Sequence, residues 1–319
     1  MLISKWKRGN PKLDRSEFTD FQDRVINLYI EHPEVKRIWS LLDSRRMFRR
    51  RGIQNQNAPM HLFLMGKSRV GKTQAVKRYT KKQDRGFYID EEGSKVDIIP
   101  VVYAELPDKF TPKELYNNII HGIGAVKLYG RVEVGLIKDR AFSLLQKHRT
   151  EMLIIDELDY LIPHNLLTRK QAMELIKGVA NQAGVCLVCV GTPEIEALRT
   201  LNEQHIGRYA PNTIPRFEKC DEYFINLLDD IEQNLGLKKR IGLSDVNKKY
   251  PQILHKLSMG FVGWLVPILQ NAFEIIGVFD QDFNDFNILK KLDGNVLIQA
   301  RRNVVGDITK EDIKKILKQ

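Results

Sequence analysis

The stretch "FLMGKSRVGKTQAV" at residues 63–76 determines how the rest of the chain is interpreted. An apolar run leads into a turn that contains Gly66 and Gly71, and the residues after the turn have helical spacing. Residues 66–73 match the pattern G-x-x-x-x-G-K-[ST], which requires a strand before it and a helix after it. Glycines let a backbone approach a phosphate closely, and the N–H groups at the start of a helix attract anions. The stretch therefore predicts a phosphate-binding loop.

The residues of this loop have distinct expected roles around a nucleoside triphosphate. Lys72 is expected to reach the β- and γ-phosphates, and Thr73 to ligate Mg²⁺. The other predicted nucleotide-binding residues are Gly66, Lys67, Ser68, Arg69, Val70 and Gly71. ATP and Mg²⁺ are thus the expected ligands.

Polar residues also follow two other predicted strands. The apolar run "MLIID" ends in Asp156, which is expected to hold the Mg²⁺ shell, and Glu157 is expected to polarise the attacking water as general base. The run "VCLVCVG" ends just before Thr192. Ligands bind at the carboxyl ends of strands in open α/β sheets, so Thr192 is expected to hold either the water or the γ-phosphate. The alternative for Thr192 is a plain helix cap.

Apolar runs alternate with helical patterns along most of the chain, which predicts a parallel sheet covered by helices on both faces. Strands are predicted at 60–65, 98–106, 152–156 and 185–191, and residues 83–97 read as a polar loop. After Phe224 only helical patterns remain, the last of them "TKEDIKKIL". We expect an α/β fold with three parts: an N-terminal polar arm at 1–30, an α/β core at 31–223 and a small all-helical domain at 224–319.

Composition limits the classes of partner and compartment. The net charge of +11 favours a polyanion such as DNA or RNA. The basic run "SRRMFRRR" at 44–51 is either such a contact or a solvated helix end. No apolar run is long enough to span a bilayer and no signal peptide is recognisable, so a cytoplasmic protein is expected. Cys186 and Cys189 are three apart on a strand, which places them on opposite faces and predicts core residues rather than a metal pair.

Together, "GKSRVGKT", "LIIDELDYL", "VGTPE", "GRYAPNTIPRFE" and "GFVGWLVPIL" resemble AAA+ ATPases, a P-loop NTPase class with a helical lid. Within that class the chain is most similar to the TnsC/TniB transposition regulators of Tn-seven-like and CRISPR-associated transposons, over about residues 30–275. This resemblance implies a homo-oligomer, a hexamer or heptamer in a ring or helical filament, that binds ATP between subunits around double-stranded DNA. It further implies that the oligomer connects a TniQ-type targeting protein to TnsB-like and TnsA-like transposase proteins.

The same resemblance assigns further residues. Arg208 or Arg216 matches the arginine that completes the ATP site of the neighbouring subunit, and Arg208 is slightly favoured. Trp264 stands where the family often has a lid arginine, so it is expected to stack on adenine or to pack in the lid, and hydrolysis is expected to be slow. The expected DNA contacts are Lys113, which matches a family lysine, and Lys127 and Arg131, which match no family motif but lie near it in the sequence. The alternative for each is an ordinary exposed cation.

Two rival functions share parts of these patterns. An AAA+ helicase loader or replication initiator has the same ATP site, so the site residues do not separate it from a transposition regulator. A P-loop kinase of small molecules is the rival from another class. The tandem Asp156 and Glu157, the candidate arginines and the helical lid argue against the kinase.

Overall fold

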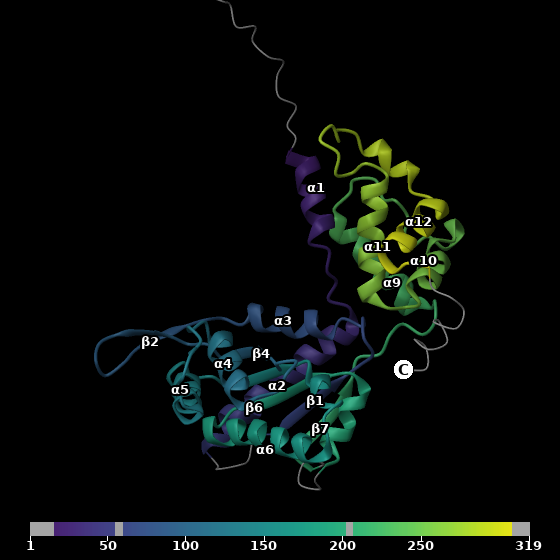
Figure 1. Cartoon of the computed structure of the whole chain (residues 1–319). Coiled ribbons are helices and arrows are strands. Elements are labelled where there is room, and N and C mark those ends of the chain that lie inside the picture. The colour runs from purple at the N-terminus through teal and green to yellow at the C-terminus, as the bar shows by residue number, and fades with distance from the viewer. Residues whose placement is uncertain (1–15, 55–59, 202–206, 308–319) are drawn as a thin grey trace, which may run out of the picture. The chain divides into compact units, whose positions relative to one another are not determined.

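The computed structural model describes residues 16–54, 60–201 and 207–307 of the chain (Figure 1). The chain forms two compact units. One unit is His32–Pro215, and the other combines the described residues of Met1–Glu31 with those of Arg216–Gln319. Each unit has a hydrophobic core of its own, so each is described separately.

The first unit is built on a five-stranded sheet in which every neighbouring pair is parallel. The strand order is β4-β5-β6-β1-β7. The strands are β1 (His61–Met65), β4 (Val101–Glu105), β5 (Met152–Asp156), β6 (Cys186–Gly191) and β7 (Tyr209–Thr213). β1, β5 and β6 are buried along their whole length, as expected for a sheet with both faces covered. The predicted parallel sheet is confirmed.

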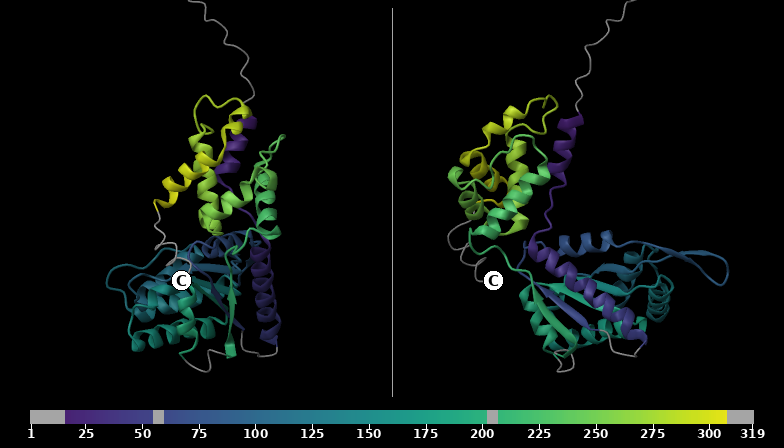
Figure 2. Two further views of the ribbon diagram at one scale, coloured as in Figure 1. Left: turned by 90° about the vertical axis from the view of Figure 1, so that its right-hand side faces the viewer. Right: turned by 180° about the vertical axis from the view of Figure 1, so that it is seen from behind.

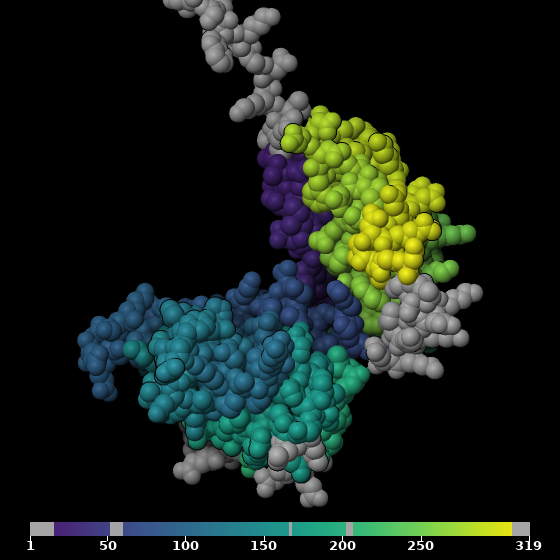
Figure 3. Space-filling model, in the orientation of Figure 1, coloured from purple at the N-terminus to yellow at the C-terminus, as the bar shows by residue number. Residues whose placement is uncertain are grey.

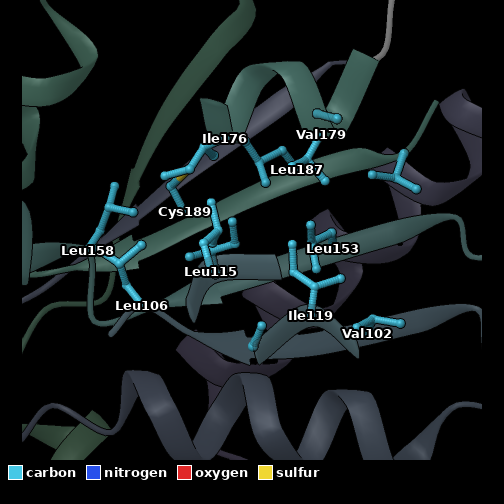
Figure 4. Close-up of a cluster of buried hydrophobic side chains, with 14 of the residues drawn as sticks. Val102, Leu106, Leu115, Ile119, Leu153, Leu158, Ile176, Val179, Leu187 and Cys189 are labelled. Atoms are coloured by element: carbon cyan, nitrogen blue, oxygen red, sulfur yellow. The ribbon is translucent and has the colours of Figure 1, made fainter. Parts of the chain in front are cut away.

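Helices cover both faces of this sheet. Alternate strand residues such as Val102, Leu153 and Leu187 form one core with three helices, as Figure 4 shows. Those helices are α4 (Pro112–Ile123), α5 (Val134–Lys147) and α6 (Leu166–Ala183). The opposite face contacts α2 (Pro33–Gln54) and α3 (Lys72–Lys82). Shorter elements follow β5 and β6, namely the 3-10 helices η1 (Leu158–Leu161) and η2 (Pro193–Ile195) and the helix α7 (Glu196–Arg199).

Local sequence signals fix the start and end of α4. The Thr111 side chain accepts a hydrogen bond from the Glu114 N–H at 3.2 Å, and Pro112 occupies the first turn. Gly124 ends the helix in the left-handed conformation, with a φ of 95°. The bounds of α4 therefore follow from residues at its own two ends.

Two predictions about strands were wrong. Residues 83–97 were expected to be a loop but contain an antiparallel hairpin of β2 (Phe87–Ile89) and β3 (Lys95–Asp97), which extends from the sheet in Figure 1. β7 was not expected at all. It is an edge strand in which Tyr209 is buried while Pro211 and Thr213 are exposed, so it lacks the apolar run that marks the other strands.

The second unit is helical. Its elements are α1 (Ser16–Ile26), α9 (Glu222–Leu235), η3 (Val246–Lys248), α10 (Tyr250–Ser258), α11 (Val262–Ile275), η4 (Phe286–Lys291) and α12 (Gly294–Val305). α1 runs along the C-terminal helices, as the purple and yellow-green segments show in Figure 3. The Gln22 side chain donates to the Val278 carbonyl at 2.8 Å, and Gln270 donates to the Val25 carbonyl at 3.0 Å. Figure 2 shows the same arrangement from two further sides.

The domain boundaries therefore differ from the expected ones. α1 is not part of a separate arm, because its buried stripe of Phe21 and Val25 belongs to the core of the C-terminal helices. That unit also begins at Arg216 rather than at residue 224. The helical pattern predicted at 309–317 lies outside the described residues.

Among the described residues, no single helix is long and apolar enough to cross a membrane, and only α10 and α11, as a pair bent by 117°, meet those criteria together. Cys189 belongs to the core beneath α4–α6, whereas Cys186 is buried outside that cluster and its thiol donates to the Met60 carbonyl. The two thiols thus occupy opposite faces, as their spacing predicts.

Candidate active site

The loop between β1 and α3 has the backbone that a phosphate site requires. Gly71 has a φ of 97°, in the left-handed region that disfavours side chains. A Cβ on Gly66 would lie 2.7 Å from the carbonyl oxygen of Ile214, so only glycine fits there. Gly71 provides no side-chain cap to α3, which leaves the N–H groups of its first turn for an anion. Val70 is buried and holds the loop against the unit, whereas Ser68 and Arg69 are exposed.

Lys72 is the first residue of α3 and lies mostly buried beneath this loop. Its ammonium donates to the carbonyls of Gly66 at 2.6 Å and Lys67 at 3.1 Å. Burial lowers the pKa of Lys72, and the carboxylates of Asp159, Asp156, Glu157 and Glu194 oppose this shift. The phosphate loop and the carboxylates predicted from β5 therefore share one site.

Asp156 ends β5 at the same edge of the sheet and is almost fully buried. Its Oδ1 accepts from the Glu157 N–H at 2.8 Å, and its Oδ2 lies 3.1 Å from the Tyr103 hydroxyl. Tyr103 is also 2.9 Å from Glu105, which binds Lys77 at 2.8 Å. Sequence reasoning missed Tyr103, because a tyrosine inside an apolar strand carries no signal of a polar partner.

Glu157 follows with a φ of 60°, which is unusual for a residue with a side chain. Its side chain is half-buried and interacts electrostatically with Lys72 and Asp156. Burial raises the pKa of Glu157, and the neighbouring charges of Asp156 and Asp159 raise it further. A carboxylate with a raised pKa is suited to take a proton from water.

Thr192 is held by a residue that the sequence analysis did not select. The Thr192 N–H donates to both carboxylate oxygens of Asp159, at 2.9 and 3.0 Å, and the Thr192 hydroxyl donates to Oδ1 of the same residue. Thr192 precedes η2, but its side chain makes no capping hydrogen bond. Thr192 thus stands at the N-cap position of η2, but its hydroxyl is bound to Asp159 and not to a helix N–H. The run "DELD" carried the signal for Asp159, two residues beyond Glu157.

The residues predicted for Mg²⁺ fit that ion. Each oxygen of Asp156 accepts one hydrogen bond from a neighbour in the described chain and keeps a lone pair for a metal. Thr73 follows Lys72 in the first turn of α3 with its side chain half-buried. Carboxylate and hydroxyl oxygens are ligands that Mg²⁺ accepts. Asp156 and Thr73 would hold the ion, which when bound neutralises phosphate charge.

The two candidate arginines differ in their surroundings. Arg208 is exposed and directly precedes β7. The first residue of β7 pairs with the first residue of β1, so Arg208 lies at the amino ends of these strands. Lys72 follows the carboxyl end of β1 and therefore lies at the opposite end of the sheet. Arg208 cannot complete the site of its own subunit. Arg216 belongs to the helical unit, where its guanidinium donates to the Met259 carbonyl at 3.0 Å and lies 5.8 Å from the Phe261 ring. These contacts give Arg216 a structural role.

Trp264 lies in the helical unit near the start of α11. Its ring packs edge-on against Phe261, with centroids 5.1 Å apart, and it borders the core of that unit. Packing in the lid is thus observed, and stacking on adenine stays a prediction.

The three residues expected to contact DNA lie on or beside one loop after α4. Lys113 donates to the Gly130 carbonyl at 2.6 Å, and Lys127 donates to the Asn118 side chain at 2.8 Å. Arg131 is exposed. The loop is also held by the fully buried Asn117, which exchanges two hydrogen bonds with the Leu128 backbone, at 3.0 and 2.9 Å. Two of the three cations are therefore partly committed to holding the loop.

The basic run at 44–51 is largely structural. Arg46 is buried and pairs with Glu151 at 2.8 Å, and Arg50 pairs with the same carboxylate at 3.0 Å. Arg49 donates to the Gly184 carbonyl. These bonds join α2 to residues that precede β5 and β6. Arg46, Arg49 and Arg50 are thus bound within the unit, whereas the sequence offered a polyanion contact or a solvated helix end.

Comparisons with known proteins identify a family and related folds. The family model described as the bacterial TniB protein matches residues 26–219. Similar solved structures include the ORC2 protein of Aeropyrum pernix in ADPNP–ADP complexes, with 14% identity, a TM-score of 0.55, and coverage of 87% of this chain and 69% of that one. The ORC1 protein of Aeropyrum pernix in complex with DNA has 16% identity, a TM-score of 0.55, and coverage of 89% and 69%. Cdc6p from Pyrobaculum aerophilum has 14% identity, a TM-score of 0.57, and coverage of 94% and 74%.

At these identities the solved structures establish the fold alone, a parallel sheet flanked by helices with a helical C-terminal unit, as in the ORC and Cdc6 proteins. No curated protein matches the chain. The family match covers the whole of the α/β unit, including the phosphate loop, Asp156, Glu157 and Thr192. The chain belongs to the TniB family of AAA+ ATPases.

Proposed function

We propose that the chain binds ATP with Mg²⁺, hydrolyses it, and assembles on double-stranded DNA as a regulator of transposition. In this role the oligomer links a TniQ-type targeting protein to the recruitment and activation of TnsB-like and TnsA-like transposase proteins. The observation that carries the proposal is the convergence of Lys72 with Asp156, Glu157 and Asp159 at the carboxyl edge of the sheet. Membership of the TniB family supports the biological role.

The chemistry of hydrolysis follows from this convergence. The open N–H groups of α3 and the Lys72 ammonium would bind the phosphates, in place of the carbonyls that Lys72 now contacts. Glu157 would take a proton from the attacking water, and its raised pKa favours that transfer. Because Arg208 lies at the opposite edge of its own sheet, we assign it to the ATP site of the next subunit.

This arrangement would make hydrolysis depend on assembly. A subunit without a neighbour has Lys72 and the Mg²⁺ ligands but lacks the Arg208 guanidinium, which would add to the stabilisation of the charge that develops on the γ-phosphate. ATP would therefore act mainly as an assembly switch, and hydrolysis would favour release from DNA. Sequence-independent contacts from Lys113, Lys127 and Arg131 to phosphates suit a protein that acts wherever targeting directs it.

A replication initiator or helicase loader is the second candidate, because the structural neighbours include ORC and Cdc6 proteins. These neighbours share the fold at low identity, whereas the TniB family match is specific to the sequence. We therefore prefer the transposition regulator. Stimulation of a transposase, but not of helicase loading, by the purified protein would separate the two.

The first test is negative-stain microscopy of the purified protein with duplex DNA, with and without a non-hydrolysable ATP analogue. We expect rings or filaments only when nucleotide and DNA are both present. Lys72→Ala should abolish them, whereas Lys81→Ala, an exposed lysine on the same helix, should not. A monomer under every condition would contradict assembly.

A further inference from the structure

The hydrogen bonds between Asp159 and Thr192 fix which way the threonine hydroxyl points. A hydroxyl has one proton and two lone pairs, and the Thr192 proton is directed to the carboxylate of Asp159. The Thr192 N–H also donates to both oxygens of that carboxylate, so Asp159 acts as an acceptor throughout. A Cβ on Gly191 would lie 2.8 Å from Oδ2 of Asp159, so the glycine leaves the room that this pair occupies. The contact thus joins the residues after β5 to the end of β6.

This direction restricts what Thr192 can bind. With its proton committed to Asp159, the hydroxyl presents only lone pairs to the nucleotide side of the site. Lone pairs repel a phosphate oxygen, which is itself an acceptor, but they accept a hydrogen bond from water. The sequence left open whether Thr192 holds the water or the γ-phosphate, and the hydrogen-bond polarity favours the water.

We propose that Asp159 is a positioning residue that polarises Thr192, so that Thr192 and Glu157 together orient the attacking water. This inference rests on the proposed hydrolysis of ATP. The water donates one proton to Thr192 and the other to the Glu157 carboxylate, which directs its oxygen lone pair toward phosphorus.

The chemical step balances with these groups. The water oxygen forms a bond to the γ-phosphorus while the bond between that phosphorus and the β–γ bridging oxygen breaks. The electron pair of the broken bond leaves on ADP, and the water proton held by Glu157 transfers to its carboxylate. Asp159 and Thr192 keep their own protonation throughout the step.

Asp159→Asn tests the direction of the hydrogen bond between the Thr192 hydroxyl and residue 159 without changing the shape of the side chain. Oδ1 of Asp159 accepts from both the N–H and the hydroxyl of Thr192, whereas Oδ2 accepts from the N–H alone. With the amide oxygen at the Oδ2 position, the Thr192 N–H keeps its acceptor, and the amide NH₂ at the Oδ1 position donates to the Thr192 hydroxyl and turns its proton toward the nucleotide. We expect kcat to fall about tenfold, as for the loss of one oriented hydrogen bond, while the KM for ATP stays unchanged. Thr192→Val should have the same effect and Thr192→Ser should retain activity.

The double variant separates this role from a structural one. Asp159→Asn should cause no further loss in a Thr192→Val background, because valine keeps the N–H but has no hydroxyl to polarise. If Asp159→Asn lowered kcat equally in the wild-type and Thr192→Val backgrounds, or left kcat unchanged in the wild type, the inference would be overturned. The proposal that the protein hydrolyses ATP would still stand. If Glu157→Gln hydrolysed ATP as fast as the wild type, the proposed function and the inference would fall together.

Discussion

At the scale of single residues, two glutamates at the carboxyl edge of the sheet have opposite electrostatic surroundings. Burial raises the pKa of Glu157 from its ordinary value of 4.5, and the charges of Asp156 and Asp159 add to the shift. A hydrogen bond from Lys77 lowers the pKa of Glu105. The charged form is therefore disfavoured in the folded protein at Glu157 and favoured at Glu105.

Their substitution should change stability in opposite directions. Glu157→Gln should raise the melting temperature at neutral pH, because the raised folded pKa makes the ionised group destabilising above 4.5. The gain should shrink as the pH falls through the folded pKa and vanish below 4.5. Glu105→Gln should lower the melting temperature at neutral pH, and this loss should disappear as the pH falls through the lowered folded pKa. Thermal melts of both variants between acid and neutral pH check the prediction. Changes in melting temperature of the same sign for both variants at neutral pH would contradict it.

At the scale of elements, Asn117 connects α4 to the loop that carries the predicted DNA contacts. Asn117→Ala would leave the N–H and carbonyl of Leu128 unpaired, which should cost roughly 2 kcal/mol of unfolding free energy. Amide exchange should accelerate across residues 125–133. His121→Ala, at an exposed position of the same helix, is the matched control. Unchanged exchange in the loop would show that Lys113 and Lys127 hold it without Asn117.

α1 makes a second prediction at this scale, because its core contacts all lie in the helical unit. Phe21 is 2% exposed, and its ring centroid lies 5.8 Å from that of Phe273 and 5.5 Å from that of Phe286. Phe21→Ala should destabilise that unit by about 3–4 kcal/mol. Tyr223→Ala, 69% exposed in the same unit, should have little effect.

The two units can be followed separately in the same urea titration. Trp264 lies in the helical unit and Trp39 in the α/β unit, so variants in which Trp6 and one of these two tryptophans are replaced by phenylalanine report one unit each. In Phe21→Ala, the urea midpoint of unfolding should fall when the fluorescence of Trp264 is followed and stay unchanged when that of Trp39 is followed. Equal shifts at both would mean that the units unfold together.

At the scale of the whole molecule, the position of Arg208 predicts that activity can be restored by mixing two inactive proteins. Arg208→Ala keeps its own Glu157, and Glu157→Gln keeps its own Arg208. If Arg208 acts in the neighbouring site, a one-to-one mixture should regain activity at about a quarter of the sites, those in which each subunit supplies its intact half. Each variant alone should be inactive with DNA present.

ATPase assays at several mixing ratios would measure this recovery. Arg216→Ala should behave differently, because Arg216 binds the Met259 carbonyl and its loss should loosen the helical unit. Failure of the mixture to recover activity, with both variants folded and bound to ATP, would remove Arg208 from the site.

The sequence by itself determined the phosphate loop, the strand that carries Asp156 and Glu157, and the alternation of strands and helices. These features are local. Gly66 leaves no room for a Cβ, and Gly71 has a left-handed backbone that disfavours side chains. Buried strands require apolar runs, and Thr111 caps its own helix. Each feature can therefore be recognised from a few consecutive residues.

Only the tertiary structure decided which distant segments meet. α1 packs on helices some 245 positions away, Asp159 binds Thr192 across 33 positions, and Tyr103 meets Asp156 across 53. β7 completes the sheet although Tyr209 is its only fully buried residue. The physical reason is that these pairings depend on the packing of complementary faces and on the sheet order, neither of which any short stretch encodes.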